Sequence, residues 1–355
     1  MVEALDENGQ PVDWWFMYKV PQLKKGAGND EASGYEYVYY DANIDKGNKS
    51  DRKVHKSNFR IDQNTGALNN TLNSVFKNPS STMGWILYND EKPNSAEGSD
   101  DANLGHTKGV IAFDTASDSA YWLLHSWPKF ADPGAAGEPT PKYGQTYLCV
   151  SIDIATAGKI AEQMANHQEP QTYACRRAAN LPKTDPLSLL MQPLNPNAPA
   201  DSSVIDLKSK GAMPFKVIAK NRKWGQDFWN DLVGPKLGED LDVESWIRGP
   251  IPPIADSDGI HKTFDIKYIT LGPLGAHWAW PETHDHAKWG ITRHSDWICV
   301  GDINRMISQR KRGGGTIAFQ NETLWKSLSK TNLILAPPGH SRGEAHKVIE
   351  ATHQE

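Results

Sequence analysis

Short apolar segments, separated by polar stretches rich in glycine and proline, run along the whole chain and predict many strands with few helices. In the first half, the predicted strands cover residues 12–20, 35–40, 84–88, 110–113, 122–126 and 147–152. In the second half, they cover residues 215–219, 264–271 and 297–301. Polar loops are expected at residues 91–105 and 247–260. The pattern favours mixed sheets with long ordered loops over a helical bundle.

Three helices are expected among these strands. Two have candidate N-caps, Thr156 for a helix after strand 147–152 and Asn321 for a final helix. The third helix, after strand 215–219, is expected to stop at Gly234-Pro235. The buried faces of the three would carry Ile160 and Met164, then Phe228, Trp229, Leu232 and Val233, and finally Leu324 and Leu328.

One order of features occurs in both halves of the chain. A His-Thr-Lys triplet at 106–108 precedes an apolar strand that begins with tryptophan, 122–126. A His-Ala-Lys triplet at 286–288 precedes a similar strand, 297–301. The repeated order indicates an ancient internal duplication. A pseudo-two-fold axis would then place both triplets at one cleft between the halves.

The stretch 181–202 is rich in proline, asparagine, serine and aspartate and is the best candidate for a linker. Residues 1–180 would form an N-terminal half with the first triplet, and residues 203–355 a C-terminal half with the second. Each half is expected to be a mixed β-sheet flanked by helices. The fold class is therefore α/β, in the mixed α+β sense.

Composition restricts the partners that the chain can have. The 355 residues are 38% hydrophobic and 23% charged, which is typical of a soluble globular protein. The net charge of −5 gives no overall attraction for a polyanion, so any phosphate site must be a local basic cleft. No apolar run is long enough to span a membrane, and residues 2–10 show no leader pattern. We expect no membrane partner, and a bacterial cytoplasmic chain or one whose leader has been removed.

The chain has three cysteines, Cys149, Cys175 and Cys299, which cannot all pair with one another. Their spacing matches no zinc motif. We expect buried, reduced thiols in an intracellular or bacterial protein.

Each triplet places a histidine and a lysine at positions i and i+2: His106 with Lys108, and His286 with Lys288. In a strand these positions point to the same face, so each pair could enter a shared pocket. Two such pairs would supply two acid–base groups and two clamps for phosphate oxygens, which suffices to break a phosphodiester bond without a metal. The alternative is two exposed polar strand ends, but two copies with matching strands favour the functional interpretation.

A metal site is a competing interpretation of the second triplet. His284 and His286 have Glu282 and Asp285 beside them and could bind zinc or another divalent ion. The rest of the chain offers no matching ligand set in motif form. We therefore expect no metal and no other cofactor.

The run 309–315 contains three basic residues followed by three glycines. It is either a solvated turn or a flexible loop whose cations and backbone amides bind phosphates. The sequence leaves both interpretations open.

Segments along nearly the whole chain resemble the deoxyribonuclease II family of acid endonucleases, within the phospholipase D superfamily. They are residues 9–14 (GQPVDW), 87–90 (LYND), 105–109 (GHTKG), 124–128 (LHSWP), 143–150 (YGQTYLCV), 285–289 (DHAKW), 299–305 (CVGDINR) and 312–316 (RGGGT). Two departures indicate a bacterial relative. An amino-terminal cysteine that would pair with Cys149 is absent, and Ala318 stands where a cysteine usually follows the glycine run.

The resemblance implies two phospholipase D-like halves and metal-independent hydrolysis of DNA. One histidine would attack phosphorus to form a phosphohistidine, and the other would protonate the leaving oxygen and later activate water. Lys108 and Lys288 would hold the non-bridging oxygens. The products would carry 3′-phosphate and 5′-hydroxyl ends. Which of His106 and His286 attacks stays open at this point.

The resemblance also suggests supporting residues. Asn304, with Asp302 in the same motif, would orient the second site, and Ser126 or His125 the first. The candidate DNA contacts are Arg305, Arg310, Lys311 and Arg312. Two alternatives stay open, namely another phosphodiesterase acting on a phospholipid or a nucleotide, and a non-catalytic DNA-binding relative. A homodimer that extends the cleft also stays open.

Overall fold

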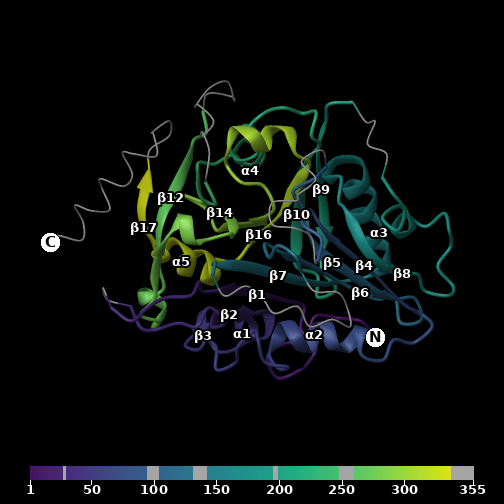
Figure 1. The fold of residues 1–355 in the computed structure, drawn as a ribbon, viewed down its shortest axis with the longest axis horizontal. Helices are drawn as coiled ribbons and strands as arrows, with labels where there is room; N and C mark the ends of the chain where they lie inside the picture. Colours follow the sequence, from purple (N-terminus) through teal and green to yellow (C-terminus); the bar gives the residue numbers. More distant parts are fainter. Residues whose placement is uncertain (27–28, 94–103, 131–141, 195–198, 248–259, 337–355) are drawn as a thin grey trace.

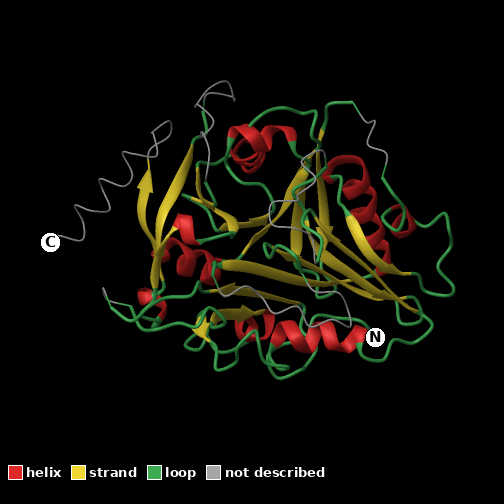
Figure 2. Cartoon of the chain, in the orientation of Figure 1, coloured by secondary structure: helices red, strands yellow, loops and turns green. Residues whose placement is uncertain are grey.

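Two large sheets form the centre of the molecule. The computed structural model describes residues 1–26, 29–93, 104–130, 142–194, 199–247 and 260–336. Figure 1 shows the strands of both sheets packed together, and Figure 2 shows the helices lying around them. All nine strands predicted from the sequence are confirmed.

The first sheet has eight strands, all of them antiparallel to their neighbours. Their order across the sheet is β3 (His55–Lys56), β2 (Tyr37–Asp41), β1 (Trp14–Lys19), β7 (Gln145–Ile152), β6 (Ser119–His125), β5 (Lys108–Asp114), β4 (Met83–Asn89) and β8 (Thr172–Arg176).

The second sheet has nine strands, and β11 and β12 form its parallel pair. The order is β13 (Ala279–Pro281), β12 (Thr263–Thr270), β11 (Leu241–Ser245), β14 (Lys288–Thr292), β15 (Trp297–Gly301), β16 (Gly314–Gln320), β10 (Pro214–Lys220) and β9 (Ser202–Lys208). A further strand, β17 (Asn332–Ala336), pairs with β12.

Helices are short. The α-helices are α1 (Ala42–Lys46), α2 (Ala67–Phe76), α3 (Ile154–Gln163), α4 (Gly234–Leu237) and α5 (Glu322–Thr331). Two π-helical turns span Met164–Gln168 and Trp229–Val233, and 3-10 turns span Pro186–Leu189, Gly272–Leu274, Glu282–His284 and Ile307–Lys311. No helix in the described ranges is long and apolar enough to cross a membrane.

The order of elements repeats between the two sheets. In the first, β5, β6 and β7 are neighbours and lead into α3; in the second, β14, β15 and β16 are neighbours and lead into α5. On one side β4 flanks β5 as β11 flanks β14, and on the other β1 flanks β7 as β10 flanks β16. The expected two-half arrangement is therefore present. The edges differ, because β12 lies parallel to β11 whereas β8 lies antiparallel to β4.

One large apolar core runs through both sheets. Trp14 of β1 packs against Phe319 of β16 with ring centroids 5.5 Å apart. Tyr18 of β1 packs edge-on against Trp280 of β13 at 5.6 Å. Since apolar surface from each half is buried by the other, we expect the halves to fold as one unit.

The change from one sheet to the other falls between Arg176 and Ser202, close to the predicted linker 181–202. This segment is packed where it is described, because Leu187 and Leu190 are fully buried. The bounds of the two halves, 1–180 and 203–355, stay a prediction.

Helix ends show where local sequence signals compete. Asn321 caps α5 as predicted, since its Oδ1 accepts a hydrogen bond from the Leu324 N–H at 2.9 Å. The predicted cap of α3 is wrong: Asp153 is the N-cap, and its carboxylate accepts from the N–H of Thr156 at 2.6 Å. An aspartate in the capping position satisfies the same free N–H groups that Thr156 was expected to satisfy.

The predicted helix stop at Gly234-Pro235 is also wrong. The π-helical turn Trp229–Val233 runs directly into α4, and the chain leaves the helix at Gly238, which has a φ of 71°. Pro235 is tolerated because it lies in the first turn of α4, where its missing N–H has no α-helical partner. Gly238 supplies the left-handed conformation that ends the helix.

All three cysteines are free thiols. Cys149 and Cys299 are buried as expected, but Cys175 is exposed. The prediction fails at Cys175 because it lies in β8, an edge strand of the first sheet.

Candidate active site

The two triplets meet where the halves face each other. Lys108 is the first residue of β5, and Lys288 is the first residue of β14. Both side chains are buried. Burial, helped by the charge of Lys108, lowers the pKa of Lys288 to about 7. The charge of Lys288 also contributes to lowering the pKa of His106. The structure therefore brings His106, Lys108 and Lys288 into one electrostatically coupled site.

Each half also provides a backbone carbonyl that binds the N–H of the histidine in the other half. The backbone N–H of His106 donates to the carbonyl of Gly313 at 2.8 Å, and the N–H of His286 donates to the carbonyl of Gly144 at 2.9 Å. Gly313 directly precedes β16 and Gly144 directly precedes β7, so each is the entry to the third strand of the repeat. A two-fold arrangement of the halves would produce this reciprocity.

His106 is held in one orientation and one tautomer. Its Nδ1 lies 2.6 Å from the carbonyl oxygen of Asp302. A carbonyl can only accept, so in the neutral ring Nδ1 carries the hydrogen and Nε2 carries the lone pair. Burial and the charge of Lys108 lower the pKa of His106 well below its usual value, although Asp90 opposes them.

Asp90, which follows the last residue of β4, is the centre of an ion cluster around His106. Its Oδ1 pairs with the ammonium of Lys108, and its Oδ2 lies 3.2 Å from Arg312 Nη2 and 3.5 Å from His106 Nε2. Burial alone would raise the pKa of Asp90, but Lys108, His106 and Arg312 lower it below its usual value. Asp90 was not among the predicted site residues, and its only signal in the sequence was the Asn89-Asp90 strand end inside a segment that resembles the family.

Two glycines let backbone pass close to the first triplet. Gly105 donates its N–H to the carbonyl of Glu169 at 2.9 Å. A Cβ at Gly105 would lie 1.9 Å from the carbonyl oxygen of Gln168, and a Cβ at Gly313 would lie 2.6 Å from the same oxygen. The backbone at Gln168-Glu169 therefore packs closely between the first triplet and the segment that precedes β16.

His286 has a different environment from His106. Tyr143 stacks on its ring with centroids 4.0 Å apart and an angle of 14° between the planes. Trp246 lies against it at 4.1 Å and 48°. The ammonium of Lys288 donates to the backbone carbonyl of His286. Aromatic faces thus surround the second histidine where charged groups surround the first.

Asp285, beside His286, is fully buried, and its carboxylate accepts hydrogen bonds from buried groups. Its Oδ2 accepts from the hydroxyl of Tyr18 and from Trp280 Nε1 at 2.7 Å, and its Oδ1 accepts from the N–H of Ala287 at 2.8 Å. Burial raises the pKa of Asp285. Within the described ranges, no three His, Cys, Asp or Glu side chains are grouped to hold a metal ion. His284, the other proposed ligand, is exposed at the end of the 3-10 turn Glu282–His284.

Asp302 lies at the first triplet rather than the second. Its carbonyl holds His106, and its Oδ1 accepts from the N–H of Lys108 at 3.4 Å. Burial raises the pKa of Asp302 to about 8, against the opposing charge of Lys108. Asn304 is buried two residues further along, and its Oδ1 makes no hydrogen bond with any described residue.

Ser126 and His125 support the end of β6. Ser126 Oγ donates to Gln145 Oε1 at 2.5 Å and accepts from the N–H of Thr146 at 3.0 Å. His125 Nδ1 accepts from the N–H of Trp127 at 3.2 Å, and burial lowers its pKa to about 3. Their proposed role in orienting a catalytic histidine stays a prediction.

The basic run does not form the flexible loop that was one interpretation of it. Residues 307–311 form a 3-10 turn, and Gly314 begins β16. The buried ammonium of Lys220 donates to the carbonyls of Gln309 at 3.1 Å, Arg310 at 3.2 Å and Arg312. Arg312 is buried and points into the first site, whereas Lys311 is exposed.

Arg305, a second proposed DNA contact, is fully enclosed. Its Nη1 pairs with Asp265 at 2.5 Å, and its Nε pairs with Asp227 at 3.2 Å. A guanidinium in this position is not available to a phosphate in this structure. Lys311 and Arg310, which is partly exposed, therefore remain the better candidates for DNA contacts.

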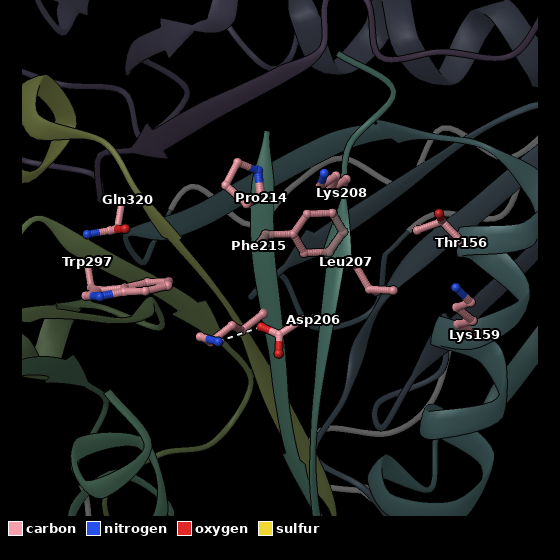
Figure 3. A pocket seen from close by; sticks show the side chains of 10 residues that line it. Thr156, Lys159, Asp206, Leu207, Lys208, Pro214, Phe215, Trp297 and Gln320 are labelled. Carbon is pink, nitrogen blue, oxygen red and sulfur yellow. Dashed lines mark hydrogen bonds and ion pairs between the residues drawn. The ribbon is translucent and has the colours of Figure 1, made fainter. Parts of the chain in front are cut away.

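Figure 3 shows a separate pocket of about 510 Å³, lined by residues of α3, β9, β10, β15 and β16. Trp297 and Gln320, which line it, pair at one end of β15 and β16, whereas Gly301 pairs with Thr316 near the triplets. The other lining residues are Thr156, Lys159, Asp206, Leu207, Lys208, Pro214, Phe215 and Lys216. This pocket is not part of the site formed by the triplets.

The sequence of the chain matches a known family over almost its whole length. The family model described as Deoxyribonuclease II covers residues 3–336. The chain belongs to the deoxyribonuclease II family. A Burkholderia pseudomallei relative named "Putative deoxyribonuclease-2" is 62% identical over 353 residues, which are 99% of each chain. Rat deoxyribonuclease-2-alpha is 33% identical over 336 residues, covering 91% of this chain and 90% of the rat protein.

Membership of the deoxyribonuclease II family makes the chain a hydrolase of the nuclease class. Among solved structures, yeast tyrosyl-DNA phosphodiesterase is similar with a TM-score of 0.32 and 10% identity, over 61% of this chain and 67% of the yeast chain. Both triplets lie inside the stretch that the deoxyribonuclease II family model matches.

Proposed function

We propose that the protein is an endonuclease that hydrolyses DNA phosphodiester bonds through a covalent phosphohistidine, without a metal ion. Family membership supports DNA as the substrate. One observation carries the mechanism: His106 and Lys108 from one half are coupled to Lys288 from the other in a buried site. Such a site can offset the negative charge of a phosphodiester with protein cations alone.

The two lysines would hold the non-bridging oxygens of the phosphate. Lys108 is kept in position by its ion pair with Asp90, and Lys288 by its hydrogen bond to the His286 carbonyl. Burial strengthens their attraction for a phosphate, because charges interact more strongly where water is excluded.

His106 is the better nucleophile of the two histidines. The Asp302 carbonyl fixes the hydrogen on Nδ1, so Nε2 has the lone pair that attacks phosphorus. The lowered pKa keeps this ring neutral in mildly acid solution. His286 would then be the acid that protonates the leaving oxygen.

The proposed reaction has two steps. First, the His106 Nε2–phosphorus bond forms while the bond from phosphorus to the 5′ oxygen breaks, and the proton on His286 passes to that oxygen. Second, neutral His286 takes a proton from water, the water oxygen bonds to phosphorus and the nitrogen–phosphorus bond breaks. The products have a 5′-hydroxyl and a 3′-phosphate, and both histidines return to their starting states.

The protonation states favour an acid optimum. His106 must be neutral and His286 protonated, and Lys288, whose pKa is about 7, loses its positive charge as the pH rises through that value. Activity should therefore fall above about pH 7, as Lys288 loses its proton, and the proposed acid His286 must also keep its proton for the first step.

Plasmid nicking with EDTA between pH 4 and 8, followed by end-group analysis, tests the proposal. We expect nicking with EDTA present, 3′-phosphate ends, and loss of cleavage in His106→Ala and His286→Ala with unchanged circular dichroism. Loss of activity in EDTA that zinc restores would instead support the metal site at His284 and His286. DNA binding without nicking would indicate a non-catalytic relative, and release of choline from vesicles with plasmid spared would indicate a lipase.

A further inference from the structure

The two histidines have different neighbours at equivalent positions of the repeat. In the first half, Asn89 pairs with Lys108 across β4 and β5, and Asp90 follows Asn89. In the second half, Ser245 pairs with Lys288 across β11 and β14, and Trp246 follows Ser245. Asp90 and Trp246 therefore occupy the same place relative to the catalytic lysine.

The same relation holds for a second pair. Arg312 precedes Gly313, whose carbonyl binds the His106 N–H, and Tyr143 precedes Gly144, whose carbonyl binds the His286 N–H. The Asp90–Arg312 ion pair at the first histidine is thus replaced at the second by two aromatic rings, Tyr143 and Trp246, with centroids 6.1 Å apart.

Aromatic faces distinguish a protonated imidazole from a neutral one. The negative face of an aromatic ring attracts a cation within about 6 Å of its centroid. The rings of Tyr143 and Trp246 lie 4.0 Å and 4.1 Å from the ring centroid of His286, so both are within that range. All three side chains are partly buried, which strengthens the attraction because less water competes for the charge.

From this geometry we propose that Tyr143 and Trp246 are positioning residues that stabilise the protonated form of His286, so that this histidine is the acid of the reaction. The inference rests on the proposed function above and assigns one part of it to two residues that do not touch the reacting atoms. One ring comes from each half, since Tyr143 precedes β7 and Trp246 follows β11. The acid therefore needs both halves assembled.

Several charged groups lie near His286 or its neighbours. The ammonium of Lys288 donates to the His286 carbonyl and opposes protonation of the ring, and the ammonium of Lys142 lies 5.0 Å from the Tyr143 ring centroid. Asp285 is adjacent in sequence, but its carboxylate accepts from Tyr18, Trp280 and Ala287. Lys108, Asp90 and Asp302 act on Lys288, and Glu244 acts on Asp285. The aromatic rings must stabilise the proton on His286 against the positive charge of Lys288.

Direct titration of His286 by NMR tests the inference without relying on catalysis. The full-length protein would carry ¹³C-labelled histidine, and because the chain has 12 histidines, the His286 signal would be assigned by its loss in His286→Asn. The variants are Tyr143→Leu and Trp246→Leu, with Tyr143→Phe and Trp246→Phe as matched controls that keep an aromatic face.

We expect each leucine variant to lower the pKa of His286 by about half a unit to one unit, and the phenylalanine controls to stay within about 0.2 unit. The alkaline limb of kcat/KM for plasmid nicking should move to lower pH by a similar amount. A His286 pKa that is unchanged or raised in both leucine variants would overturn the inference.

A graded series covers the case in which the leucine variants do not fold. Phenylalanine, 4-fluorophenylalanine and 3,4,5-trifluorophenylalanine at position 143 keep the ring shape while removing negative charge from its face. The His286 pKa should fall along this series, and a constant pKa would count against the inference. If the wild-type protein does not cleave DNA, the proposed function fails, whereas the titration still decides what the two rings do.

Discussion

The two His-x-Lys sites begin from the same backbone and differ in what surrounds the histidine. Each lysine starts the equivalent strand, β5 or β14, and each histidine donates its N–H to a glycine of the other half. Charged Asp90 and Arg312 stand at the first histidine where aromatic Trp246 and Tyr143 stand at the second. The repeat places both His–Lys pairs in the same way, and in the proposed mechanism the different neighbours set which histidine is neutral and which is protonated. Two copies of a motif can therefore take opposite roles in one reaction.

The largest expected effect comes from separating these roles with an activated leaving group. Thymidine 3′-(4-nitrophenyl phosphate) releases nitrophenolate, which needs no proton from an acid. His106→Ala should lose at least about 10³-fold in kcat/KM on this ester and on DNA, because no nucleophile remains. His286→Ala should lose a similar factor on DNA but form the phosphohistidine on the ester.

Rapid mixing measures this difference. The His286→Ala variant should give a burst of about one nitrophenolate per active site, followed by slow turnover, because the base for the second step is missing. Mass spectrometry should find the phosphoryl group on His106. A burst in His106→Ala, with the phosphoryl group on His286, would reverse the assignment.

The next effect compares two buried carboxylates of the first site. Asp90 lies between Lys108 and Arg312, so Asp90→Asn leaves two buried cations without their counter-ion and should cost about 3–5 kcal/mol in the free energy of unfolding at pH 6. Asp302 behaves oppositely, because its pKa of about 8 means that the folded protein favours the neutral carboxyl.

The raised pKa of Asp302 determines how this carboxyl changes the free energy of unfolding with pH. Stability tied to a raised carboxyl pKa is complete below the unfolded value of about 4 and is lost as the pH rises toward the folded value of about 8. Asp302→Asn resembles the neutral form and should remove that loss, so the variant gains stability over wild type between pH 4 and 8. Urea unfolding at pH 4, 6 and 8 measures both variants. A stability for Asp302→Asn below that of wild type at pH 8 would contradict the assignment.

Much of the fold could be predicted from the sequence, because its strands carry their signal locally. Residues such as Val110–Phe113 form an uninterrupted apolar run, and β5 indeed contains them. The two triplets were also found locally, since i and i+2 spacing needs no knowledge of the tertiary structure. In contrast, Gly314 was expected in a turn or a flexible loop but begins β16, because strand pairing with β10 overrides glycine's local preference.

The partners of the histidines could not be predicted, because they lie far away in the chain. Asp302 is 196 residues from His106, and Arg312 is 222 residues from Asp90. Asp302 was expected at the second site because it shares a motif with Asn304, yet its carbonyl contacts His106 of the first site. Contacts between a residue of one half and a residue of the other leave no periodic signal in a single sequence. Of the two aromatic residues at His286, Tyr143 had one signal in the sequence, its place in the segment 143–150 that resembles the family.

A smaller effect compares the two lysines. Burial lowers the pKa of Lys288 to about 7, so the folded protein binds fewer protons than the unfolded chain between about pH 7 and 10.5. Wild-type stability should therefore rise with pH across that window. Lys288→Met should abolish cleavage yet raise Tm by a few degrees at pH 6, because it removes a desolvated ammonium.

Lys108→Met should give the contrasting result. It leaves Asp90 with less positive charge beside it and should lower Tm at the same pH, although cleavage is lost equally. Differential scanning calorimetry at pH 6 compares the two variants. Equal changes in Tm would mean that the two lysines do not differ in how their charge is balanced.

The smallest expected effect concerns the segment that leads into β16 in the second half. This segment supplies buried Arg312 to the first site and carries exposed Lys311 beside it. If Lys311 contacts a DNA phosphate, Lys311→Gln should make the slope of log kcat/KM against log salt concentration less steep by about 0.7–0.9, with kcat unchanged. Lys159→Gln, at the separate pocket of Figure 3, is the matched control and should leave the slope unchanged. An equal change in both variants would show that the dependence on salt comes from the overall charge of the protein. The segment that leads into β16 would then contribute to the site only through Arg312.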